Sequence, residues 1–210
     1  MMIETHLKIL IGGAPRTGKS LLAASLSQNF CIPVIHGDTL VNAMKNGYPG
    51  SFGVQFDSLH KHDYAAQMQP VQLFLKKVIR NMGKDIAYRA KVFESCYLHP
   101  KTVQRLSRES TVLAVFLLYS NFDTEIRISE IRKYASVNQH CWSHKHSDAS
   151  LRKSLTDLHK FSAFLKKKCQ QHNVRCAYIG NDWKQTWMEV KNDLNSRVFK
   201  EISSNLQGSE

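Results

Sequence analysis

The stretch GGAPRTGKS, Gly12 to Ser20, constrains the fold of this chain more than any other feature. It follows the apolar segment LKILI at 7–11 and contains the spacing G-x-x-x-x-G-K-S from Gly13 to Ser20. The glycines permit backbone conformations in which successive N–H groups point at phosphate oxygens, and a following helix presents its positive N-terminal end to the same charge. The sequence therefore predicts a strand, a phosphate-binding loop and a helix, in that order.

Lys19 and Ser20 are the two side chains of this loop that carry chemistry. Lys19 is expected to reach the terminal phosphates of a nucleotide, and the Ser20 hydroxyl is expected to ligate Mg²⁺. Arg16 either contacts phosphate as well or points to solvent. The alternative is a glycine turn capped by Ser20, but the complete motif and its strand–helix context agree independently. The predicted nucleotide-binding set is Gly13, Ala14, Pro15, Arg16, Thr17, Gly18, Lys19, Ser20 and Leu21.

Short segments rich in β-branched or aromatic residues recur between longer helical patterns. Such alternation predicts an α/β fold with a parallel sheet covered by helices. The predicted strands lie at 7–11, 31–36, 91–96, 111–120 and 174–180. Apolar residues at three-and-four spacing predict core-facing helices within 22–30, 71–82, 151–165 and 183–198.

The length and composition fit one globular domain. The 210 residues, 42% of them hydrophobic, can bury a substantial core, so we expect a single domain over 1–210 with insertions at roughly 38–85 and 119–149. The apolar run at 112–119 is too short to cross a bilayer. No secretory signal is evident, and the five cysteines are odd in number and scattered. These features predict reduced thiols and a cytoplasmic location.

The chain is strongly basic, with 29 Lys and Arg against 17 Asp and Glu and a formal net charge of +12. Such a surface attracts anions, which include nucleotides, nucleic acids and acidic lipid head groups. Much of the charge lies on predicted helix faces, where a solvated surface is the simplest explanation. A basic patch without stacking aromatic residues is weak evidence for nucleic acid. Nucleic-acid binding therefore stays possible but is not favoured, and no membrane association is expected.

Glu94 ends the third predicted strand, directly after Val92 and Phe93. An acidic side chain there is costly to bury without a cation or hydrogen-bond donors. A phosphoryl-transfer site needs a carboxylate near the metal, and this position suits that role. We expect Glu94 to act with Ser20 at Mg²⁺; a contact with substrate or a salt bridge at the strand end are the alternatives.

The chain resembles the P-loop kinases of the adenylate-kinase-like group. The resemblance is carried by GGAPRTGKS, by HGDTL after the second strand, by VFESCYLHP on the third and by an arginine-bearing segment after the fourth. A weaker similarity, in VFESCYLHP and FLLYSNFDTEIRISEIRKY, is to relatives of 2-phosphoglycerate kinase. The resemblance implies a three-layer sandwich with a five-stranded parallel sheet of order 2-3-1-4-5 and ATP as phosphoryl donor. It also implies that the insertion at 38–85 binds the substrate and that the insertion at 119–149 is a lid that closes over the phosphates.

The resemblance also suggests roles for Asp38, Arg127 and Arg132. In related kinases an acid at the position of Asp38 interacts with the substrate hydroxyl, although an aspartate before a helix is also a common N-cap. At least one of Arg127 and Arg132 is expected to contact the transferring phosphoryl group, with Arg132 preferred. The alternative for both is ordinary pairing with Glu125 and Glu130 on the helix surface.

The predicted function is an ATP- and Mg²⁺-dependent kinase that acts on a small hydroxyl- or phosphate-bearing acceptor. Its catalytic set comprises Lys19, Asp38, Glu94, Arg127 and Arg132. Two alternatives stay open: a nucleic-acid-acting NTPase such as a polynucleotide kinase, and a nucleotide-binding protein without transfer chemistry. The sequence identifies neither the acceptor nor the oligomeric state.

Overall fold

The structure is a computed structural model, and it describes residues 7–48, 50–52, 63–82, 90–137 and 142–207. Its strands are β1 (Leu7–Gly13), β2 (Val34–His36), β3 (Ala90–Glu94), β4 (Val112–Tyr119) and β5 (Cys176–Ile179). Its helices are α1 (Lys19–Phe30), α2 (Gly37–Gly47), α3 (Tyr64–Met82), α4 (Pro100–Ser107), α5 (Thr124–Val137), the short 3₁₀ helix η2 (Trp142–Lys145), α6 (Asp148–Gln171) and α7 (Trp183–Gln207).

Each predicted strand is found, and β2 is shorter than expected. The sequence placed its start at Cys31, but Cys31 has a left-handed backbone (φ 51°) and ends α1. Pro33 follows and has no N–H to donate to a neighbouring strand. The Pro33 carbonyl still accepts from the Val92 N–H at 2.9 Å, so pairing with β3 begins immediately before β2.

The sheet is parallel and has the order β2-β3-β1-β4-β5, which confirms the predicted topology. Glu94 is in register with Ile11 of β1 and with His36 of β2. The carboxyl ends of β1, β2 and β3 therefore meet at one edge of the sheet. In open α/β sheets ligands bind outside this edge, where the chain crosses to opposite sides of the first strand.

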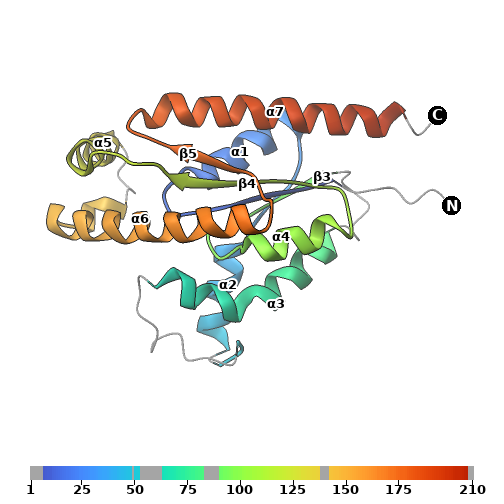
Figure 1. Cartoon of the computed structure of the whole chain (residues 1–210), viewed down its shortest axis with the longest axis horizontal. Helices are drawn as coiled ribbons and strands as arrows, with labels where there is room; N and C mark the ends of the chain where they lie inside the picture. Colours follow the sequence, from blue (N-terminus) through green and yellow to red (C-terminus); the bar gives the residue numbers. More distant parts are fainter. Residues whose placement is uncertain (1–6, 49, 53–62, 83–89, 138–141, 208–210) are drawn as a thin grey trace.

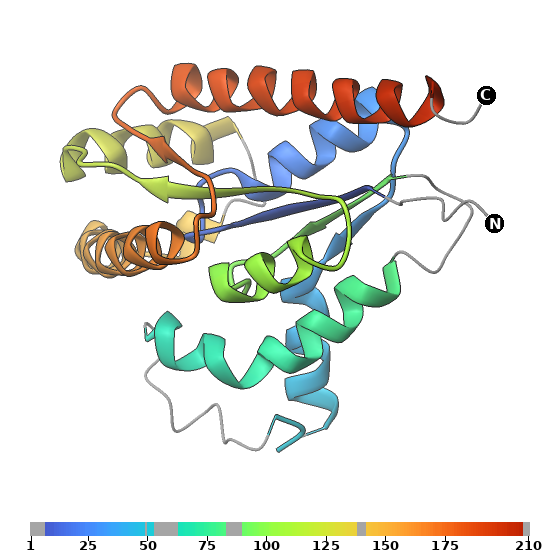
Figure 2. The same ribbon diagram turned by 45° about the vertical axis from the view of Figure 1, so that its right-hand side comes forward.

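Helices cover both faces of the sheet (Figures 1 and 2), as the three-layer expectation requires. Helices α1 and α7 lie on one face, and α4 and α6 lie on the other, with α3 packed against α4 and α6. Alternate residues of each strand point to opposite faces, so Ile9 and Ile11 pack with α1 and α7 while Leu10 packs with the opposite layer. Among the described residues, no helix is both long and apolar enough to cross a membrane.

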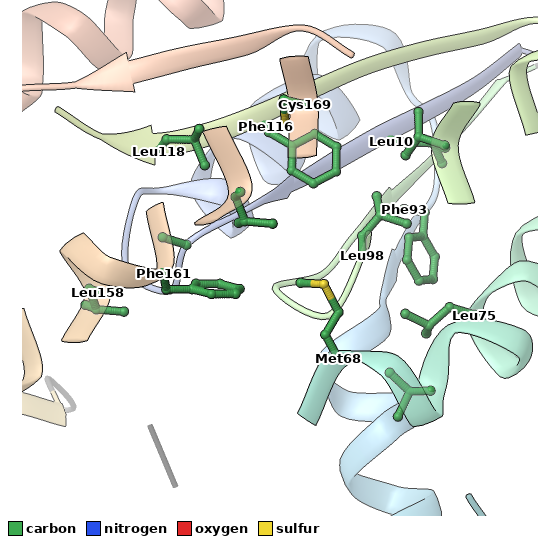
Figure 3. Close-up of a cluster of buried hydrophobic side chains, with 14 of the residues drawn as sticks. Leu10, Met68, Leu75, Phe93, Leu98, Phe116, Leu118, Leu158, Phe161 and Cys169 are labelled. Atoms are coloured by element: carbon green, nitrogen blue, oxygen red, sulfur yellow. The ribbon is translucent and has the colours of Figure 1, made fainter. Parts of the chain in front are cut away.

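The larger of the two apolar clusters fills the space between the sheet and helices α3, α4 and α6. Figure 3 shows Phe93 and Phe116 of the sheet together with Leu75 of α3 and Phe161 of α6. Phe93 and Phe116 are fully buried. Burial of this apolar surface stabilises the packing of these helices on the sheet. It thereby holds in place the strand ends that carry the polar residues of the site.

His99 is a buried polar group beside this cluster. It precedes α4, and its Nδ1 accepts from the Lys101 backbone N–H at 3.0 Å. Burial, together with the nearby positive charges of His172, Lys168 and Lys101, lowers the pKa of His99 to about 4. The imidazole is therefore neutral at pH 7.

Candidate active site

Two glycines give the loop between β1 and α1 its shape. Gly13 has φ +124°, and a Cβ on it would lie 2.0 Å from the Leu117 carbonyl oxygen of β4. Gly18 has φ +89° and immediately precedes α1; a Cβ there would lie 2.7 Å from Trp187 and 2.9 Å from Trp183. Both positions thus require glycine for backbone conformation and for space. The loop backbone is held in a form that an L side chain would not allow.

Lys19 lies across this loop and is almost completely buried. Its Nζ donates to the Ala14 carbonyl at 2.8 Å, and the Thr17 hydroxyl donates to the same oxygen at 2.8 Å. The first turn of α1 contains no acidic residue, and Gly18 offers no side chain to cap it. The positive end of the helix and the Lys19 ammonium therefore act together at the loop, as an anionic ligand requires.

The other predicted loop residues lie around this centre. Arg16 is exposed, has a left-handed backbone (φ 65°), and offers its carbonyl to the Tyr119 hydroxyl at 2.9 Å. Ala14 is buried and donates its N–H to the Leu117 carbonyl at 2.9 Å. Pro15 is half-buried, and Leu21 is exposed. The loop is thereby fastened to β4 at two points.

Glu94 and Ser20 meet at the carboxyl edge of the sheet. The Ser20 hydroxyl donates to Glu94 Oε1 at 3.2 Å, and His36 Nδ1 lies 2.8 Å from the same oxygen. Glu94 accepts in both contacts when it is ionised, so His36 carries its proton on Nδ1. The Glu94 side chain is only 4% exposed. A hydroxyl beside a carboxylate is a set of hard oxygen donors of the kind that Mg²⁺ prefers, so these residues fit the expected metal.

Asp38 lies in the first turn of α2 but does not cap that helix. The N-cap position is His36, which makes no side-chain capping bond. Asp38 Oδ1 instead accepts from the Ser95 hydroxyl at 2.6 Å and from the Cys96 N–H at 3.0 Å. The N-cap alternative for Asp38 is therefore wrong. The carboxylate connects α2 to the segment after Glu94, which places both acids at the same edge.

Lys45 is a cation that interacts electrostatically with Asp38. Lys45 of α2 donates to the Tyr97 hydroxyl at 3.1 Å, and its Nζ lies 4.6 Å from the centre of the Tyr97 ring. Burial lowers the pKa of Lys45, and the negative charge of Asp38 opposes that effect. Sequence reasoning missed Lys45 because a lysine in a surface helix has no distinguishing pattern.

Arg127 is buried next to the loop. Its guanidinium carbon lies 5.9 Å from the ring centres of both Tyr119 and Trp183, and its Nη1 donates to Glu130 at 2.7 Å. The Nε atom is buried without a hydrogen-bond partner. Tyr119 contacts the loop through Arg16, so the arginine is one side chain away from the phosphate-binding backbone.

Arg132 lies elsewhere on α5 and is held by other partners. Its Nε and Nη2 donate to Asp148 Oδ1 at 3.0 and 2.7 Å, and Nη1 and Nη2 also donate to the carbonyls of Ser143 and His146 at 2.9 and 2.6 Å. These bonds connect α5 to η2 and to the start of α6. Arg132 would have to release them to reach a nucleotide, whereas Arg127 already lies beside the loop.

Two tryptophans from α7 form a wall against the loop. Their rings stack with centroids 5.7 Å apart, and Trp187 Nε1 donates to the Gly18 carbonyl at 3.2 Å. The sequence placed them on a core-facing stripe, and both do pack against the cluster beneath α1. Their contact with the loop was missed, as was His36. Both contacts join segments far apart in the chain, which no local pattern reveals.

No protein-family model matches the sequence, and no curated protein is significantly similar to it. Similar solved structures exist. Shikimate kinase from Bacteroides thetaiotaomicron aligns with TM-score 0.52 and 14% identity over 90% of this chain and 98% of that one. A gluconokinase from Sinorhizobium meliloti 1021 aligns with TM-score 0.45 and 16% identity over 95% and 99%. Together with the sheet order and the loop geometry, the match to shikimate kinase shows that the two proteins share one fold, a five-stranded parallel sheet of order 2-3-1-4-5 between layers of helices.

Proposed function

We propose that this chain is an ATP- and Mg²⁺-dependent kinase that transfers the γ-phosphoryl group to a small hydroxyl-bearing acceptor. The observation that carries the proposal is the convergence of Lys19, Ser20 and buried Glu94 at the carboxyl edge of the sheet. A nucleotide-binding loop alone would need only the backbone and the lysine. The buried carboxylate beside the serine adds a metal-binding function, which phosphoryl transfer requires.

The loop residues would bind the donor. Backbone N–H groups from Gly13 to Ser20 and the Lys19 ammonium would hold the β- and γ-phosphates of ATP. Ser20 and Glu94 would hold Mg²⁺, which when bound neutralises charge on the phosphate oxygens. His36 would fix the orientation of Glu94 through their 2.8 Å hydrogen bond.

Asp38 would act on the acceptor. Its Oδ1 is fixed by Ser95 and Cys96, so the carboxylate keeps one orientation near the loop. It would accept the proton of the acceptor hydroxyl or orient that hydroxyl for attack. Lys45, whose charge interacts with that of Asp38, would favour an acceptor that also carries negative charge. This role fits the prediction that the insertion at 38–85, which contains α2 and α3, binds the substrate.

The segment 119–149 would serve as the lid. It contains α5, which Figure 1 shows at the edge of the sheet toward which β4 points. Arg127 is the arginine in this segment that we assign to the nucleotide, because it is buried between Tyr119 and Trp183 beside the loop. Arg132 would instead keep the lid helix attached to α6 through Asp148.

The test is a screen for ADP release from MgATP across nucleoside, nucleotide, sugar, phosphoglycerate and single-stranded oligonucleotide acceptors, with an acceptor-free control. We expect acceptor-stimulated turnover with at least one small acceptor. Lys19→Ala should abolish it, and Asp38→Asn should keep ATP binding while losing acceptor-dependent turnover. Stimulation by oligonucleotides alone would favour the polynucleotide kinase alternative. Tight ATP binding without turnover on any acceptor would favour a nucleotide-binding protein.

A further inference from the structure

Two cysteines meet where α6 turns into β5. Cys169 is in the last turn of α6, is fully buried, and lies beside Phe116 of β4 in Figure 3. Cys176 opens β5 in register with the same Phe116 and is half-buried against the same apolar cluster. The chain between them turns back tightly, since the Val174 N–H donates to the Cys169 carbonyl at 2.9 Å. The two thiols interact, and each shifts the pKa of the other.

The surroundings of the two sulfur atoms differ. Cys176 Sγ lies 3.4 Å from the Tyr178 hydroxyl on the same face of β5, and the Lys166 ammonium lies 5.3 Å from the centre of the Tyr178 ring. Cys169 is enclosed by apolar side chains. The Cys169 hydrogen bond, the Tyr178 hydrogen bond and the Lys166 charge together lower the pKa of Cys176 to about 6, although partial burial opposes them. The pKa of Cys169 is raised, because it donates to Cys176 and is buried.

The half-buried Cys176 sulfur therefore favours the thiolate form, whereas the buried Cys169 sulfur favours the thiol form. The thiolate is the nucleophilic form of cysteine, and partial exposure allows a small oxidant to reach it. A neighbouring thiol in contact with the reactive sulfur can then complete a disulfide. This combination distinguishes the pair from Cys96, which is buried and whose pKa is raised by that burial, and from Cys31, which is exposed at the end of α1.

We propose that Cys169 and Cys176 form a peroxide-sensitive dithiol, with Cys176 as the attacking sulfur and Cys169 as the resolving one. The Cys176 thiolate attacks hydrogen peroxide: an S–O bond forms, the O–O bond breaks, and the leaving hydroxide takes a proton from solvent to become water. Cys169 sulfur then attacks the Cys176 sulfenic acid: an S–S bond forms, the S–O bond breaks, and hydroxide leaves as water with the Cys169 proton. The two cysteines lose two electrons in all, and peroxide is reduced to two waters.

The experiment uses the full reduced chain treated with hydrogen peroxide at neutral pH, quenched by alkylation under denaturing conditions and digested with trypsin. Cleavage after Lys168, Arg175 and Lys184 separates the two cysteines into the peptides CQQHNVR and CAYIGNDWK. We expect these peptides joined by a disulfide that dithiothreitol reverses. Absence of the joined pair, or a preferred linkage to another cysteine, would overturn the proposal.

Variants assign the two roles. Cys169→Ser should stop the reaction at a sulfenic acid on Cys176 that dimedone traps, and Cys176→Ser should leave Cys169 unoxidised. Cys31→Ser is the matched control and should leave the disulfide unchanged. One measurement needs no variant: in the unmodified chain, the rate of iodoacetamide labelling of Cys176 should rise with pH, with a midpoint near pH 6. In a separate variant, Tyr178→Phe, that midpoint should lie at a higher pH. Labelling of Cys176 no faster than that of Cys31 at pH 7 would contradict the proposed roles.

Discussion

Replacement of Glu94 by glutamine should separate catalysis from stability. The carboxylate is buried and receives two hydrogen bonds, from Ser20 and His36. A hydrogen bond to a charged group contributes about 1.5–3 kcal/mol against about 1 kcal/mol for a neutral pair, so neutralisation weakens the two contacts by roughly 2–3 kcal/mol in total. Relief of the cost of burying the charge offsets this loss by an amount of the same order.

The net change in the free energy of unfolding should therefore lie within about 1 kcal/mol of zero. Turnover should fall far more, because a neutral amide replaces the carboxylate that would hold Mg²⁺. Loss of one such group typically costs about 100- to 1000-fold in rate, or roughly 3–4 kcal/mol. The Mg²⁺ concentration required for half-maximal activity should also rise in Glu94→Gln.

Urea denaturation measures the change in the free energy of unfolding. ADP release over a Mg²⁺ titration measures the change in turnover and in the Mg²⁺ requirement. Glu109→Gln is the matched control, since Glu109 pairs with Arg80 on the surface. If Glu94→Gln lost more than about 3 kcal/mol of stability while its folded fraction turned over at the wild-type rate, Glu94 would be a structural residue and the assignment of the metal site would be refuted.

Three further predictions concern the loop, the lid and a buried histidine. In steady-state kinetics, Arg127→Ala should lower kcat by about a thousandfold, whereas Arg132→Ala should keep kcat within about twofold. In urea denaturation, Arg132→Ala should lower the free energy of unfolding by roughly 2–3 kcal/mol. A large loss of kcat in Arg132→Ala, with little loss in Arg127→Ala, would assign the catalytic role to Arg132 instead. Gly18→Ala should weaken ATP binding at least about tenfold in calorimetry, since its Cβ would displace the tryptophan wall, and Gly47→Ala, with open space around it, should leave binding unchanged. The pKa of His99 falls from 6.5 in the unfolded chain to about 4 in the folded one, so between pH 6.5 and pH 4 the unfolded chain binds a proton that the folded chain does not. The free energy of unfolding should therefore drop by up to about 3 kcal/mol as the pH decreases from 6.5 to 4. Chemical denaturation of His99→Gln should show a flatter pH dependence, and equal slopes for both proteins would contradict the burial argument.

The loop and the sheet were predictable because their signals are local. The glycines and Lys19 lie within one short motif, and each strand is a short segment rich in apolar residues. A site role for Glu94 could also be predicted from the sequence, because burying an acid at the end of a strand is costly without a partner. The partner itself could not be predicted, because the hydrogen bond from His36 to Glu94 depends on the register between β2 and β3.

The two lid arginines show where sequence reasoning stops. Arg127 and Arg132 lie on one helix with similar neighbours in the sequence, so no local pattern decides between them. They differ in what the fold brings to them: Tyr119 and Trp183 surround Arg127, whereas Asp148 and two backbone carbonyls hold Arg132. These partners come from β4, α6, α7 and η2, so only the tertiary structure distinguishes the surroundings of the two arginines.

The bond between Trp187 and Gly18 spans 169 positions of the chain. The loop between β1 and α1 precedes in the chain, by many residues, the helix α7 whose tryptophans support it. During synthesis the loop would therefore stay incomplete until α7 has been translated and has packed on the sheet. We therefore expect any nucleotide affinity of a nascent chain to rise only after Trp187 has reached Gly18.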